Sequence, residues 1–124
     1  MRRRGIAGAV AFLLAASTVL YAEEIAQDWM PDVLRMPEDA TVVADREIGT
    51  VRMFSITTAE NVDELLPEWE ESLRLNGFPV SRGDGELLEK AIEFSGQGIV
   101  NAKIIVAPVR EDGLSLIEFD ATLN

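Results

Sequence analysis

After residue 40, apolar and polar residues alternate with a period of two in several short segments, and this alternation is typical of half-buried β-strands. The predicted strands are Thr41–Ile48, Thr50–Thr57, Phe78–Arg82, Leu88–Ser95, Ile99–Ala107 and Leu114–Leu123. Short turn segments follow most of them, including Gly83–Gly85, Gly96–Gly98 and Pro108–Gly113. Such short connections imply that consecutive strands pair in an antiparallel manner.

The alternation also predicts which side chains share a face of the sheet. The expected apolar groups are Val42, Ala44 and Ile48; Phe54 and Ile56; Leu88, Ile92 and Phe94; Val100, Ala102, Ile104 and Val106; and Ile117, Phe119, Ala121 and Leu123. The opposite face would carry Glu93, Lys103, Glu118 and Asp120, and this composition suits contact with solvent.

Between the second and third strands, the apolar period changes to three and four residues, which predicts an amphipathic helix. Its apolar stripe comprises Val62, Leu65, Leu66, Trp69, Leu73 and, less strictly, Leu75. Asn61 is the expected N-cap, with Glu64 completing a capping box, and Asn76–Gly77 is the expected end. Pro67 lacks an N–H group, so we expect a kink or a late start. The predicted fold is α+β, with the order ββαββββ and one helix packed on a single antiparallel sheet.

The first 22 residues have the layout of a secretory signal peptide. Arg2, Arg3 and Arg4 precede an uncharged stretch, Ile6–Leu20, and Ala22 stands before an acidic pair. We expect cleavage after Ala22, with a site near Ala16 as the second choice. An uncleaved anchor formed by residues 5–22 is the alternative. Either outcome places the domain on the non-cytoplasmic side, in the periplasm or outside the cell.

The predicted organisation is a signal segment (1–22), a linker (23–39) and an α+β domain (40–124). The linker contains Pro31 and Pro37 and has no sustained period. Trp29 and Leu34 are expected to pack on the edge of the domain, while the alternative is a segment that binds a partner.

Charge and composition exclude several classes of function. Eight basic and 22 acidic residues follow residue 22, a net charge of −14, which repels nucleic-acid backbones and suits either solubility or a basic partner. The chain contains no Cys, so thiolate chemistry, disulfides and lipidation at Cys are excluded. It contains no His, the usual general base and a common metal ligand. We therefore expect a protein that is not an enzyme and has no catalytic, metal or cofactor residues.

Two acidic regions have side chains that a binding or catalytic site could use, but each has a simpler interpretation. The segment Ser81–Glu86 offers oxygen ligands on a Gly-rich turn, and it contains the integrin-type tripeptide Arg82–Gly83–Asp84. A hairpin turn explains the same residues. Glu68, Glu70 and Glu71 crowd one part of the helix, but neighbouring helix positions do not face one another, so a solvated surface is expected.

From Pro37 to Leu123 the chain resembles a loose group of small exported bacterial domains of unknown function. The resemblance rests on Pro37–Ala40, on Leu73 leading into Asn76–Phe78, on Ile92–Ser95 followed by Gly98, on Ala102–Val106 with Pro108, and on Ile117–Phe119. It implies a bacterial periplasmic setting and carries over no catalytic or binding residue.

The expected function is that of an exported interaction or envelope-assembly module with a protein partner and no nucleic acid. The membrane would be involved only through residues 5–22. The alternative is a domain that binds a small ligand or a cation through acidic loops around Asp84, Glu86, Glu111 and Asp112.

Overall fold

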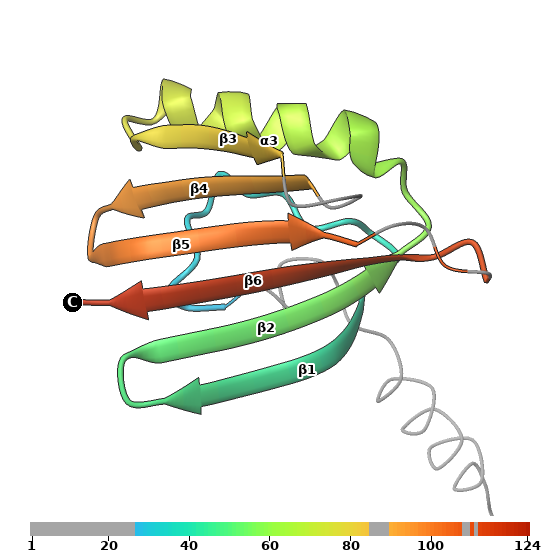
Figure 1. The fold of residues 1–124 in the computed structure, drawn as a ribbon, viewed down its shortest axis with the longest axis horizontal. Coiled ribbons are helices and arrows are strands. Elements are labelled where there is room, and N and C mark those ends of the chain that lie inside the picture. The colour runs from blue at the N-terminus through green and yellow to red at the C-terminus, as the bar shows by residue number, and fades with distance from the viewer. Residues whose placement is uncertain (1–26, 85–89, 108–109, 111) are drawn as a thin grey trace, which may run out of the picture.

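The computed structural model describes residues 27–84, 90–107, 110 and 112–124 (Figure 1). The elements are β1 (Thr41–Ile48), β2 (Val51–Thr58), α3 (Val62–Leu75), β3 (Val80–Asp84), β4 (Lys90–Gly96), β5 (Ile99–Val106) and β6 (Ser115–Leu123). The six strands form one antiparallel sheet in the order β1-β2-β6-β5-β4-β3. The predicted α+β class and the order ββαββββ are confirmed, while the signal segment lies outside the described residues.

The core lies on the face of the sheet that α3 covers, here called the covered face. A row of directly opposed residues crosses its centre, from Phe54 through Phe119 and Ile104 to Ile92. All four are at most 1% exposed. The ring of Phe119 lies 5.7 Å from that of Phe54 and 5.6 Å from that of Trp69 on the helix, measured between centroids. The helix stripe therefore meets the sheet at its aromatic centre.

The start of α3 follows its sequence signals. The side chain of Asn61 accepts a hydrogen bond from the backbone N–H of Asp63 at 2.9 Å, which satisfies one of the free donors of the first turn. Glu64 accepts from the side-chain amide of Asn61 at 3.2 Å, so its contact differs from the bond to the backbone N–H of the N-cap residue that the predicted capping box requires. The helix runs from Val62 through Pro67, so the predicted late start is wrong.

The end of α3 has the hydrogen-bond pattern of a Schellman motif. The N–H of Phe78 donates to the carbonyl of Leu73 at 3.0 Å, and the N–H of Gly77 donates to that of Arg74 at 3.1 Å. Gly77 has a φ of +88°, which glycine adopts without a steric cost. Leu73 and Phe78 are both buried, so this motif also turns the chain back towards the sheet.

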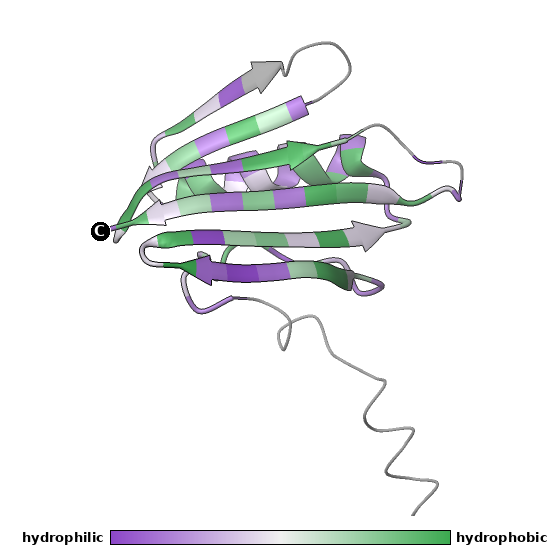
Figure 2. Ribbon diagram, turned by 60° about the horizontal axis from the view of Figure 1, so that its bottom comes forward, coloured by the Kyte–Doolittle hydropathy of each residue, from purple (hydrophilic) through white to green (hydrophobic). Residues whose placement is uncertain are grey.

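A single helix cannot cover a sheet of this width. Six strands about 4.8 Å apart span roughly 24 Å, whereas a helix is about 10 Å across. The helix packs over β3 and β4, and residues 27–40 lie on the same side of the sheet (Figures 1 and 2). Met30, Leu34 and Met36 from this segment are 4–5% exposed and belong to the core. The prediction that Trp29 and Leu34 pack on the domain is confirmed, although Trp29 is only partly buried.

Polar contacts hold residues 27–40 against the helix and β2. The indole N–H of Trp69 donates to the carbonyl of Arg35 at 2.8 Å. The carboxylate of Asp39 accepts from the backbone N–H of Ala59 at 2.7 Å and from the hydroxyl of Thr58. These hydrogen bonds attach residues 27–40 to the end of β2 and to the middle of α3.

Two β-bulges overturn part of the predicted face assignment. The β1–β2 register shifts between Val42 and Ala44, so Val42 lies opposite the core residue Ile56 while Ala44 lies opposite Ser55 on the other face. A second shift between Ile99 and Asn101 buries Ile99 and leaves Val100 54% exposed. Each inserted residue changes the side-chain alternation by one position, so the groupings of Val42 with Ala44 and of Val100 with Ala102 are wrong.

Candidate functional site

Of the three crowded helix carboxylates, Glu68 and Glu70 are in ion pairs with different cations, while Glu71 is exposed and is in no ion pair with another described residue. Glu70 pairs with Arg74 at 2.7 Å and with Arg82 of β3 at 2.7 Å. Glu68 binds Arg35 at 2.9 Å, and Glu60 binds the same guanidinium at 3.2 Å. Arg35 donates side-chain hydrogen bonds to Glu68 and Glu60, and these bonds raise the pKa of Arg35 above its usual value. These carboxylates brace the fold, and they do not form the facing pair that acid–base catalysis needs.

The acidic loop expected after Arg82 is partly a strand. Arg82 belongs to β3, as predicted, but Gly83 and Asp84 belong to β3 as well, so the prediction that these two residues begin a turn is wrong. Residues 85–89 lie outside the described residues. Glu111 also lies outside them. Asp112 accepts from the backbone N–H of Leu114 at 3.0 Å and pairs with Arg110 at 3.0 Å. Within the described part of the chain, no group of three metal-ligating side chains comes together.

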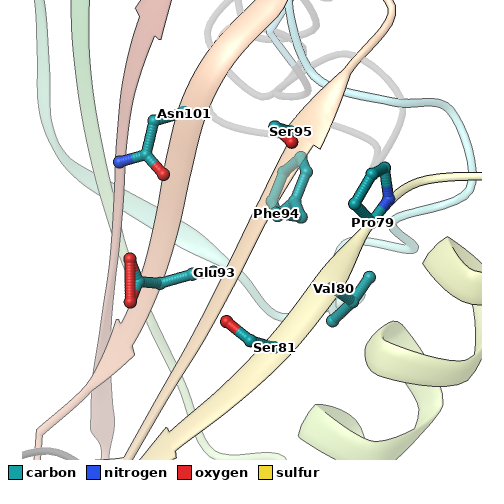
Figure 3. A pocket seen from close by; sticks show the side chains of 7 residues that line it. All are labelled: Pro79, Val80, Ser81, Glu93, Phe94, Ser95 and Asn101. Carbon is teal, nitrogen blue, oxygen red and sulfur yellow. The ribbon is translucent and has the colours of Figure 1, made fainter.

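A polar hollow lies on the face of the sheet opposite α3, here called the open face. It has a volume of about 270 Å³ and lies between β3, β4 and β5 (Figure 3). Its polar side chains are Ser81, Glu93, Ser95 and Asn101, one or two from each strand. The β4–β5 register shifts at Ser95, beside this hollow, where the strands turn.

The chemistry of this hollow is that of hydrogen bonding. Ser81 and Ser95 offer hydroxyl groups, Asn101 an amide and Glu93 a carboxylate. Among the described residues, no hydrogen bond joins either serine to Glu93, so neither hydroxyl has the adjacent base that activates a nucleophile. The arrangement suits polar groups of a ligand or of a partner chain.

A second hollow, of about 340 Å³, adjoins the first on the open face. Its walls include the apolar side chains Val51, Met53 and Ile105, with Lys103 and Asp120 beside them. Asn101 lines both hollows, so together they reach from β2 to β3 across the open face.

A row of alternating charges crosses the same face. Lys103 lies directly opposite Glu93 on one side and Asp120 on the other, and Asp120 in turn lies opposite Met53, which lies opposite Arg46. The eight basic residues after residue 22 are all described, and six of them are in ion pairs within 4 Å. The two that are in none of these pairs, Arg46 and Lys103, both belong to this row.

The exposed apolar side chains are concentrated at one edge of the sheet. Seven large apolar residues are exposed in the described part of the chain, and five of them lie on β1 and β2. We call these five the hairpin patch: Val42, Val43, Ile48, Val51 and Met53, which are 38–59% exposed. Ile48 lies directly opposite Val51 and shares the open face with Val51 and Met53, and the latter two also line the second hollow. Val42 lies on the covered face, opposite Ile56.

Sequence reasoning missed the hairpin patch. The alternation along β2 already places Val51 and Met53 on one face of the strand and the buried residues Phe54 and Ile56 on the other face. Apolar residues are unusual on a strand face that contacts solvent, so this composition was the sequence signal from which the patch could have been predicted. The alternation does not reveal whether a neighbouring element covers these side chains, because that depends on the order of the strands in the sheet.

Comparisons with protein-family models, with curated proteins and with solved structures find no match for this chain. Among the described residues, no helix has the length and apolar character needed to cross a membrane.

Proposed function

We propose that this protein is an exported, non-enzymatic module that binds a protein partner through the hairpin patch and the adjoining open face. The observation that carries the proposal is the concentration of five of seven exposed large apolar side chains on β1 and β2. Exposed apolar side chains that gather in one place are typical of protein-binding surfaces, whereas single ones scattered over a surface need no explanation.

The surroundings of the patch support a protein partner. Apolar side chains bordered by polar ones are the usual composition of a protein interface. Here Val51 and Met53 give the apolar part, and Lys103, Asp120 and Asn101 border it. Among the described aromatic residues, Trp29 is partly buried and the others, Phe54, Phe78, Phe94, Phe119 and Trp69, are buried. None of them belongs to the hairpin patch, so the patch itself has no ring on which a sugar could stack.

Site-specific photo-crosslinking in the producing cells tests the proposal. A photoactivatable residue replaces either Ile48, which is 59% exposed in the hairpin patch, or Leu75, which is 77% exposed at the end of α3. We expect an adduct of one discrete mass from the Ile48 position and none from the Leu75 position. Absence of an adduct at Ile48, or the same adducts at both positions, would overturn the proposal.

The proposed location is the periplasm or the exterior, since the domain follows a segment with signal-peptide layout. The intact mass of the protein from fractionated cells tests this. A mass that begins near Glu23 in a soluble non-cytoplasmic fraction supports a free domain. A mass that retains Met1 in the membrane fraction supports the anchored alternative, and recovery from the cytoplasm contradicts both.

A further inference from the structure

We infer that the partner binds by adding an extended strand to the outer edge of β1, with a basic–acidic–basic run of side chains opposite Asp45, Arg46 and Glu47. The inference rests on the proposed function, because it specifies how the same protein-binding surface is used. Strand addition supplies main-chain hydrogen bonds for affinity, while the side chains opposite the edge strand supply specificity.

The first observation is that, within the described part of the chain, no strand pairs with the outer edge of β1. This strand pairs with β2 on one side and with no described strand on the other. Seven of its eight residues are exposed and Ala44 is half-buried, so the described residues bury no side chain of this strand. The other edge strand, β3, packs against α3 and is bound to it through Arg82 and Glu70. The β1 edge is therefore the more accessible of the two for a further strand.

The second observation is that the middle of β1, from Ala44 to Glu47, is poorly suited to pair with a copy of itself. A two-fold axis places one residue of an antiparallel pair opposite its own copy. Centred on Asp45, Arg46 or Glu47, the pair puts like charges directly opposite each other, which is unfavourable. Centred on Ala44, the pair runs through the bulge at Val43, where the ladder is interrupted. Charges and bulges are common protections of an edge against self-association.

The charges of Asp45, Arg46 and Glu47 favour a partner strand whose sequence differs from that of β1. From the described residues, Asp45 accepts only a long hydrogen bond of 3.4 Å, donated by Gln27. Glu47 pairs with Arg52 and keeps 70% of its side chain exposed. Arg46 is in no ion pair with another described residue. A basic–acidic–basic run complements these three residues, and it reads the same in both chain directions. The prediction therefore holds for a parallel or an antiparallel partner.

Two synthetic peptides of identical composition test the inference against the protein as recovered from its producing cells. Both have valines flanking three charged residues, which are lysine–glutamate–lysine in the first peptide and lysine–lysine–glutamate in the second. In either chain direction, the second order places like charges at two of the three positions. Two pairs change from attraction to repulsion, so we expect the first peptide to bind about tenfold more tightly. We also expect it to slow hydrogen exchange at the amides of β1.

A charge-reversal variant provides the control. With Arg46→Glu, each peptide has two favourable pairs and one unfavourable pair, so the preference should disappear. Arg74→Glu makes the same change of charge on α3 and should leave the preference intact. Equal binding of both peptides, protection elsewhere than β1, or a preference that survives Arg46→Glu would overturn strand addition.

Failure of the inference is distinguishable from failure of the proposed function. An adduct at Ile48 that the first peptide does not suppress would leave protein binding standing and remove strand addition. Concentration-dependent dimers with protected β1 amides would identify a second copy as the occupant, contrary to the inference. Neither an adduct nor peptide binding would remove both.

Discussion

Replacing Leu34 by alanine tests whether residues 27–40 are part of the folded core. Leu34 is 4% exposed and lies in the same core cluster as Trp69 and Ile117. The substitution removes three carbon atoms, worth about 0.8 kcal/mol each in transfer free energy, or about 2.4 kcal/mol. A residual cavity adds to this cost, and measured values for such changes are about 2–5 kcal/mol. Because Leu34 lies in a segment without helix or strand, which can relax, we expect a loss of about 3 kcal/mol.

Urea unfolding followed by tryptophan fluorescence measures this loss. Trp69 is fully buried, and Trp29 packs against the core, so both report on the covered face. With an m-value of about 1.5 kcal/mol/M, the midpoint should fall by about 2 M. The m-value itself should stay unchanged if the unfolding remains two-state.

Leu75→Ala is the matched control, since it removes the same atoms from a side chain that is 77% exposed. Its effect should stay within about 0.5 kcal/mol. A Leu34→Ala protein as stable as this control would refute the reasoning, and residues 27–40 would then be a linker resting on the domain.

Three further changes have defined expectations. Pro67→Ala supplies the N–H that the carbonyl of Asp63 lacks, at an exposed position, and should raise the free energy of unfolding by about 2 kcal/mol in urea titrations. Gly77→Ala forces a side chain into a φ of +88° and should lower the same quantity by about 1 kcal/mol, although no atom lies within 4 Å of the new Cβ. Arg35→Gln removes the exposed contact with Glu68 and should cost about 1 kcal/mol or less, a cost that shrinks in high salt during thermal melting. A loss of stability in the first, no change in the second or a salt-independent cost in the third would contradict the corresponding argument.

The fold class was predictable because most of its signals are local. The helix stripe, the cap at Asn61 and the stop at Gly77 depend only on neighbours within a few positions. The bulges were not predictable, because a strand with a bulge at Val43 or Val100 has the same residue types as a regular strand. The bulge nevertheless exchanges the two faces on which the following side chains lie.

The burial of residues 27–40 was only partly predictable, since it depends on distant parts of the chain. Met30, Leu34 and Met36 follow no helix or strand period. They are buried because the sheet is wider than α3, a relation that appears only once strand order is known. The candidate site was missed for the same reason. The strand order makes β1 an edge, and so it leaves Val51 and Met53 beside a strand with no further neighbour.

The buried core of the sheet and its exposed edge are formed by different strands. All buried apolar side chains of the sheet come from strands other than β1. Exposed side chains contribute little to the free energy of unfolding, so substitutions of Arg46 or Ile48 should leave the fold intact. A loss of binding in such variants would then report on the partner surface itself. The edge strand can therefore vary in sequence to suit a partner without changing the core that holds it in place.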